Sequence, residues 1–320
     1  MHFLTRISRI FFTSAPVKFL IRASKNIILP GFRGIPLYDV LKFFFQKLGQ
    51  PGLDDRASAI AFNFLLAIPP ALIFFLTLVP YFPISDQFIQ EMYKLIREVI
   101  PGEKNNSLII NFIKDFLLNP RTDLLSVGIL LALFYSSNAM MGIMRSFNKD
   151  FPGLKKRTTF RERIIAIELT IILFIIILIS TLLLVMQGQV LNWIGIENYY
   201  IKILISIARW VIFILLFFYS ISFIYRNAPA THKKWKLLNP GSILATFLML
   251  SFLIVFTFWV TNFATYNKLY GSIGTILVVM LMIYFNSLVL LIGFELNNSI
   301  HSLKHEVDRR KNINMDADKV

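Results

Sequence analysis

Six long apolar blocks alternate with polar segments along this chain of 320 residues. As a helix, a run of about 20 apolar residues rises about 30 Å, which is the thickness of a bilayer core. The pattern therefore predicts six transmembrane helices, with approximate limits Ala57–Val79, Leu124–Ile143, Ile164–Met186, Ile203–Tyr225, Ser242–Thr261 and Ile273–Phe294.

The last apolar block is the most informative stretch, because a distinctive polar segment lies at each of its ends. It is preceded by Tyr266, Tyr270, Gly271 and Gly274, and it is closed by Glu295. The small residues predict a turn at the start of the block. Tyrosines at such a position are typical of the aromatic belt at a membrane surface.

The segments outside the apolar blocks have patterns of their own. Residues 1–50 are basic and amphipathic. Within them, the helical spacing from Tyr38 to Leu48 fits two alternatives: an interfacial helix on anionic lipid, or a helix packed on the bundle. Residues 84–118 contain two amphipathic runs separated by a turn signal, and so predict a helical hairpin on the outer side. Residues 301–320 form a polar tail, which leaves residues 51–300 as the transmembrane domain.

Lys and Arg are concentrated in alternate connections. The segment before the first block, the second and fourth connections and the tail together hold 25 of the 33 basic residues. Cytoplasmic loops of membrane proteins carry this excess, so both termini are predicted to be cytoplasmic. We call this side of the protein the inner side.

The composition agrees with an all-α, polytopic membrane helix bundle. Hydrophobic residues make up 56% of the chain and charged residues 16%, whereas about a quarter of a soluble domain is charged. In a soluble protein the net charge of +15 would indicate nucleic-acid binding. Because these cations lie in the inner connections, we expect them to face anionic lipid headgroups, and we predict no nucleic-acid partner. The lack of Cys excludes thiolate chemistry.

Ionisable residues close to the apolar blocks are the first candidates for function, because charge inside a membrane is costly. Arg56, Arg145, Glu168 and Glu295 all lie at the inner ends of their helices. Opposite charges at one depth favour pairing, so they predict an inner polar cluster. The alternative is that each side chain reaches the headgroups separately. Arg209, in the outer half of the fourth helix, is expected to extend outward.

Neutral polar residues continue the same helical faces. Asn63 follows Arg56 on the first helix, Asn138 precedes Arg145 on the second, and Asn286, Gly293 and Asn297 form a stripe on the sixth. Such stripes face a bundle interior. They fit either a substrate cavity or interhelical hydrogen bonds with close packing.

A proline pair lies in the middle of the first helix. Pro69 and Pro70 each lack a backbone donor and crowd the preceding turn, so the helix is predicted to kink or break there. Broken helices line substrate sites in many transporters, while a simple kink satisfied by neighbouring helices is the alternative.

No recognisable catalytic motif is present in the sequence. His301, His305 and Glu306 have the order HxxxHE rather than HExxH, and no third ligand accompanies them. We therefore predict no metal, no cofactor, no catalytic residues and no enzymatic activity.

Four passages resemble the YihY / virulence factor BrkB family of bacterial inner-membrane proteins. They are AIAFNFLLAIPPALIFFLTLVP, ALFYSSNAMMGIMRSFNKDF, YRNAP with the downstream NPGSILAT, and NFATYNKLYGSIGTILVVMLMIYFNSLVLLIGFELN. The last is the most specific, although Ile283-Tyr284 replaces a frequent Trp-Leu-Tyr and Phe294 replaces a common Ala. The resemblance implies six spans, a multi-pass location in the bacterial inner membrane, and a link to envelope integrity.

Two functions are compatible with these patterns. The first is a transporter or translocase of lipid or another amphiphilic envelope substrate, whose anionic head would bind Arg56 and Arg145 in a cavity between the first, second and sixth helices. The second is a membrane scaffold that recruits envelope-biogenesis partners, with homo-oligomerisation left open. The family was once labelled a ribonuclease, and this sequence does not support that activity.

Overall fold

The computed structural model describes residues 22–78, 89, 93, 110–111, 114–115, 122–149, 157–185, 199–231, 234–262 and 265–317. All regular secondary structure in these ranges is helical, as predicted. The main helices are α3 (Leu37–Leu48), α4 (Leu53–Leu78), α7 (Thr122–Asn148), α8 (Thr159–Val185), α10 (Tyr199–Asn227), α11 (Pro240–Asn262) and α12 (Thr265–Ala317). All but α3 contain a stretch long and apolar enough to cross a membrane, which confirms the six predicted spans.

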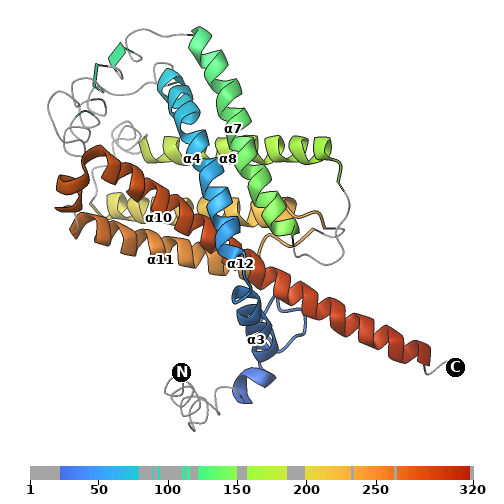
Figure 1. Cartoon of the computed structure of the whole chain (residues 1–320). Coiled ribbons are helices and arrows are strands. Elements are labelled where there is room, and N and C mark those ends of the chain that lie inside the picture. The colour runs from blue at the N-terminus through green and yellow to red at the C-terminus, as the bar shows by residue number, and fades with distance from the viewer. Residues whose placement is uncertain are drawn as a thin grey trace.

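The six long helices contact one another in a closed cycle that follows chain order, which we call the ring. In Figure 1, α4 and α7 run across the directions of α8, α10 and α11. α4 and α7 run side by side, and α8 packs on α7. α10 packs on both α8 and α11. α12 then packs on both α11 and α4, so the last helix closes the ring against the first. Consecutive helices joined by short connections are expected to be neighbours, but the closure by α12 requires contacts between distant parts of the sequence.

The shared hydrophobic core lies at the inner ends of the helices. Every long helix contributes to it, and its largest fully buried members are Ile60 from α4, Phe147 from α7, Leu169 from α8, Tyr225 from α10 and Phe294 from α12. Ala245 and Met249 of α11 complete the ring of contacts. The inner ends are therefore where the six helices are held together.

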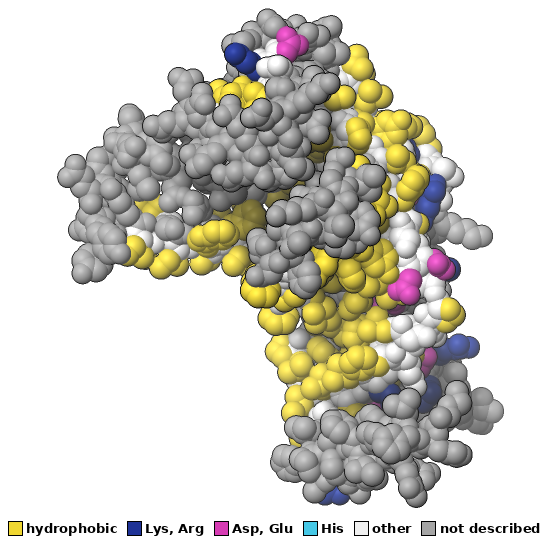
Figure 2. All heavy atoms as spheres, turned by 60° about the vertical axis from the view of Figure 1, so that its left-hand side comes forward, with side chains coloured by type: hydrophobic (Ala, Val, Ile, Leu, Met, Phe, Trp, Pro, Cys, Tyr) yellow, Lys and Arg dark blue, Asp and Glu magenta, His cyan; other side chains and the backbone are white. Residues whose placement is uncertain are grey.

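Large apolar side chains also cover the outside of the bundle. Leu130 is 70% exposed, Leu204 65% and Ile254 71%, and Figure 2 shows hydrophobic side chains forming a broad surface over the middle of the molecule. Monomeric soluble proteins rarely expose apolar patches of such extent. An apolar surface of this extent is suited to contact with lipid acyl chains. Together with the six apolar helices, this surface shows that the chain is a multi-pass membrane protein.

α3 packs against the inner part of α12. Val40 and Phe44 are buried in a second core cluster together with Leu296 and Ile300. Of the two predicted alternatives, this is the packed helix rather than a helix held by lipid alone. Phe45, on an adjoining face, remains 64% exposed.

Two local predictions differ from the structure. The turn predicted at Gly271 and Gly274 is wrong, because α12 continues through both residues. A glycine costs a helix about 1 kcal/mol, which is less than the several kcal/mol for unsatisfied backbone groups in lipid. The predicted outer hairpin at residues 84–118 falls almost wholly outside the described residues.

Of the two outcomes predicted at Pro69 and Pro70, a kink or a break, the helix does not break, and the kink stays a prediction. α4 is one helix from Leu53 to Leu78 that includes both prolines. Two prolines deprive two carbonyls of their amide partners, but α4 packs along α7 over much of its length. Helix packing of this kind keeps proline-containing membrane helices intact.

Candidate functional site

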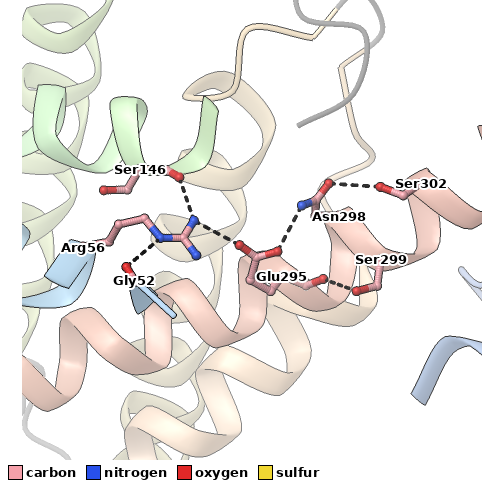
Figure 3. Close-up of polar contacts among 7 residues, drawn as sticks. All are labelled: Gly52, Arg56, Ser146, Glu295, Asn298, Ser299 and Ser302. Atoms are coloured by element: carbon pink, nitrogen blue, oxygen red, sulfur yellow. Dashed lines mark hydrogen bonds and ion pairs between the residues drawn. The ribbon is translucent and has the colours of Figure 1, made fainter. Parts of the chain in front are cut away.

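The centre of the inner end is an ion pair between α4 and α12 (Figure 3). Arg56 donates from a terminal guanidinium nitrogen to Oε1 of Glu295 at 3.2 Å. The same nitrogen donates to the carbonyl of Ser146, at the end of α7, at 3.2 Å, and Nε donates to the carbonyl of Gly52 at 3.3 Å. One side chain thus joins α4, α7 and α12.

Glu295 is enclosed more completely than its partner. Its side chain is 3% exposed, compared with 13% for Arg56. Its second oxygen, Oε2, accepts a hydrogen bond from the Asn298 amide at 3.0 Å, and its backbone carbonyl accepts one from the Ser299 hydroxyl at 2.7 Å. Burial of a carboxylate is tolerated when its lone pairs are used in this way. Of the four residues expected to form an inner polar cluster, Arg56 and Glu295 thus form an ion pair.

Arg145 lies beside this pair and lines a pocket at the inner surface. The pocket has a volume of about 400 Å³, and it is lined by Arg56, Arg145, Ser146, Asn148, Lys149 and Glu162. Arg145 is exposed and forms no ion pair with any described residue. Three cations facing one carboxylate give the pocket a net positive charge, which suits an anionic group.

Glu168 is not part of the inner cluster. Its side chain is exposed, whereas Ala166, Leu169 and Thr170 on the same helix are buried. At 100° per residue, position 168 lies off the packed face of α8. Of the four residues predicted to form the cluster, Arg56, Arg145 and Glu295 lie together and Glu168 does not. Residues at the same depth in the membrane can lie on different faces of their helices.

The two predicted asparagines lie within the bundle and have partners. Asn63 donates to the carbonyl of Ala59 in its own helix at 2.8 Å and lies next to Gly142 of α7. Asn138 accepts a hydrogen bond from Arg163 of α8. Arg163 also lies over the Phe134 ring, 4.6 Å from its centre. Interhelical bonding thus accounts for Asn138, and a role in substrate binding remains a prediction for both asparagines.

Two residues of the stripe on α12, Gly293 and Asn297, contact α11, and Asn297 also lines a pocket of about 270 Å³ beside the start of α11. Asn286 donates to the carbonyl of Met282 in its own helix at 2.8 Å. Asn297 accepts from the backbone amide of Gly241 at 2.8 Å and donates to the side chain of Asn239 at 2.6 Å. Asn239 in turn caps the start of α11 by accepting from the Ser242 amide at 2.8 Å. Gly293 lies so close to α10 and α11 that an added Cβ would be 2.5 Å from the Tyr225 hydroxyl of α10 and 2.6 Å from the Cβ of Ala245 in α11. Close packing of small residues with polar bonds is the usual means of helix association in membranes.

Two arginines that the sequence analysis assigned to basic connections have structural roles. Arg163 joins α8 to α7, as described above. Arg157 donates to the carbonyls of Ala228 and Pro229 at 3.0 and 2.9 Å, just after α10. Burial lowers the pKa of Arg157, while the charge of Glu162 opposes that shift. A guanidinium that satisfies orphan carbonyls at a helix end is a common cap.

No group of three or more His, Cys, Asp or Glu side chains suited to a metal occurs among the residues that the structure describes. His301 and His305 lie on the inner part of α12, and the absence of a metal stays a prediction. Arg209, Tyr266 and Tyr270 lie on described helices, but their side chains fall outside the described part of the structure.

Comparisons with known proteins give one consistent family. The chain is 30% identical over 268 residues to a ribonuclease-like protein, YfkH, of Bacillus subtilis (strain 168), covering 82% of this chain and 96% of that protein. It is 20% identical to a UPF0761 membrane protein of Haemophilus influenzae, covering 83% and 96%, and 22% identical to one of Pseudoalteromonas atlantica, covering 87% and 91%. No solved structure shows a significant match.

A family model also matches the whole of the transmembrane region. The match runs over residues 44–319 and thus includes α4 with Arg56, α7 with Arg145 and the whole of α12. The inner ion pair and the cationic pocket both lie within it. The chain belongs to the Virulence factor BrkB family of multi-pass bacterial membrane proteins.

Proposed function

We propose that this protein translocates an amphiphilic envelope lipid along the seam between α4, α7 and α8. The observation that carries the proposal is the cationic pocket at the inner end of that seam, where Arg145 and Lys149 lie beside Arg56. Exposed cations next to a lipid surface attract anionic headgroups with about 1 kcal/mol each. This pocket would receive the head of the substrate.

The same three helices also form an apolar hollow nearer the outer side. It has a volume of about 190 Å³ and is lined by Phe74, Ile129, Ala132, Leu133, Ile171, Phe174, Ile175 and Leu178. Ile129 and Arg145 are separated by about 24 Å along α7, at 1.5 Å per residue. A polar site at one end of a seam and an apolar site toward the other match the two parts of an amphiphile.

The seam differs from the cavity expected from the sequence. That cavity was to lie between α4, α7 and α12, but the α4–α12 contact is filled by the ion pair of Arg56 and Glu295. The pair is better suited to holding the inner ends of these helices together than to binding a substrate, because its charges already satisfy each other. The anion would meet Arg145 and Lys149 instead.

Vesicles containing a fluorescent anionic phospholipid provide the test. Wild-type protein should speed the exchange of the probe between leaflets, and Arg145→Ala with Lys149→Ala should slow it. Arg161→Ala with Arg309→Ala removes the same charge from exposed positions outside the pocket and should have no effect. Equal rates for the two double variants, or no exchange by wild type, would rule out the proposed route.

The apolar end of the seam has its own matched pair of variants. Leu133→Trp would fill the hollow, whereas Leu130→Trp places the same bulk on a side chain that is 70% exposed. The first should slow exchange and the second should leave it unchanged. If both variants behave like wild type, the acyl chain does not use this hollow.

The scaffold function has one observation in its favour. α12 continues from Glu295 to Ala317 and leaves the bundle on the inner side (Figure 1). A photoreactive residue at Val307, which is 40% exposed, would report what this extension touches in cells. Crosslinks to lipid alone would exclude a protein partner there.

A further inference from the structure

A groove between α3 and the inner extension of α12 is lined by several charged side chains. Its volume is about 570 Å³. The basic side chains that line it are Arg33, Lys42, Lys304 and Arg310, and the acidic ones are Asp39 and Glu306. Arg33, Lys42 and Arg310 are exposed and form no ion pair with any described residue, whereas Lys304 pairs with Asp308 at 2.9 Å.

Arg33 is held toward the solvent by an unusual turn. It has a φ of 54°, and Gly31 and Gly34 beside it have φ values of 90° and 82°. A left-handed conformation is uncommon for any residue other than glycine, and it persists where the surroundings impose it.

The surroundings of this turn are fixed on both sides. Phe32 and Ile35 are 5% and 6% exposed and belong to the core cluster shared by α3 and α12. An added Cβ on Gly31 would lie 2.9 Å from the ring of Pro240, so the turn also rests against the start of α11. The backbone at Arg33 is therefore fixed by the buried side chains of Phe32 and Ile35 on either side of it. This reduces the backbone entropy that is lost when the guanidinium binds a ligand.

α3 has three distinct faces at 100° per residue. Val40 and Phe44 are buried against α12, while Lys42 and Gln46 line the groove. The third face carries an exposed apolar side chain, Phe45. An apolar face beside a basic one is typical of a helix at a membrane surface, so the groove opens where lipid headgroups are available.

We propose that this groove binds the phosphate of an anionic phospholipid in the inner leaflet. Arg33 would contact the phosphate with two parallel N–H donors, the geometry in which guanidinium groups bind phosphate. Lys42 from α3 and Arg310 from α12 would approach it from either wall. Because Asp39 and Glu306 also line the groove, they would repel an anion that carries several charges. The groove is therefore better suited to a phosphodiester, which carries one negative charge.

The bound lipid would join α3 to α12. α3 and α12 already meet through apolar contacts, and a headgroup between Lys42 and Arg310 adds a bridge that depends on lipid composition. This site lies apart from the α4–α7–α8 seam, so it does not depend on the proposed translocation.

Native mass spectrometry of the purified full chain, titrated with phosphatidylglycerol, tests the assignment. Removing one cation should lower the affinity about fivefold, and removing three about a hundredfold. The variant is Arg33→Gly with Lys42→Gln and Arg310→Gln, in which glycine keeps the left-handed turn unstrained. Equal affinity of this variant and wild type would overturn the proposal.

The matched control removes three exposed cations that do not line the groove: Arg22→Gln, Arg161→Gln and Arg309→Gln. It should retain wild-type affinity, and a loss equal to that of the groove variant would show that only net charge matters. A competition with inorganic phosphate separates the sources. Displacement of the lipid by millimolar phosphate would assign the groove to a soluble phosphate compound and overturn the lipid assignment.

Discussion

The ion pair between Arg56 and Glu295 should have an asymmetric effect on stability. Arg56→Met leaves a carboxylate that is 3% exposed with the Asn298 amide as its remaining side-chain donor. Leaving one member of a buried pair uncompensated costs about 3–5 kcal/mol. At about 2–4 °C per kcal/mol for a chain of this order of size, the melting temperature should fall by about 6–20 °C.

Glu295→Met should cost less. Arg56 would keep its bonds to the carbonyls of Gly52 and Ser146, and its side chain, at 13% exposure, reaches water more readily. The expected loss is about 1–3 kcal/mol, the range for one unsatisfied buried group. The double variant with two methionines should lie within about 1 kcal/mol of wild type, because apolar residues can replace a buried pair without loss.

Thermal unfolding in detergent, followed by tryptophan fluorescence, measures all three variants. The result that supports this reasoning is non-additivity, in which the double variant is more stable than Arg56→Met alone. If the two single losses simply add, or if each stays below about 1 kcal/mol as for an exposed pair, then the pair is solvated and does not hold α4, α7 and α12 together.

Three further predictions concern the contacts that α12 makes with α10 and α11. Gly293→Ala should sharply reduce the yield of folded protein on size-exclusion chromatography, because its Cβ would lie 2.5 Å from the Tyr225 hydroxyl; Gly142→Ala, with its nearest atom at 3.5 Å, should fold normally. Asn297→Ala should lower stability by about 1–3 kcal/mol in thermal unfolding, since it leaves the Gly241 amide unsatisfied, and Asn286→Ala, whose side chain bonds only within its own helix, should have a smaller effect. Tyr225→Phe removes a 2.6 Å hydrogen bond to the carbonyl of Leu290 and should cost about 1 kcal/mol in the same assay; no change would show that aromatic packing alone places this ring.

The membrane class and the number of spans follow from the sequence because each depends on local composition. A run of apolar residues of membrane length specifies a helix whatever it packs against. That Arg56 and Glu295 lie at the same depth was also predictable, since the distribution of basic residues fixes which helix ends share the inner side, but which charges pair was not. Both inferences use only the position of a residue along the bilayer normal.

What the sequence could not supply was the direction in which each residue faces. α8 is apolar around its whole circumference, so no polar face shows where Glu168 points, and its exposure appears only in the structure. The bond from Arg163 to Asn138 was missed for the same reason, because Arg163 had been counted with the basic connection. The bond from Gly241 to Asn297 joins residues 56 positions apart, and no local pattern predicts such a contact.

The inner part of α12 shows which residues specify its contacts with α4 and α11 in a membrane, where the hydrophobic effect does not select helix partners. In lipid, apolar surfaces do not distinguish one helix partner from another, so small and polar residues must specify the contacts. Gly293 and Asn297 are four residues apart and face α11, while Glu295 lies about 200° around the helix from Gly293 and faces α4. Little more than one turn of α12 thus binds the first and the fifth spanning helices on opposite faces, and a change in its rotation would break both contacts together.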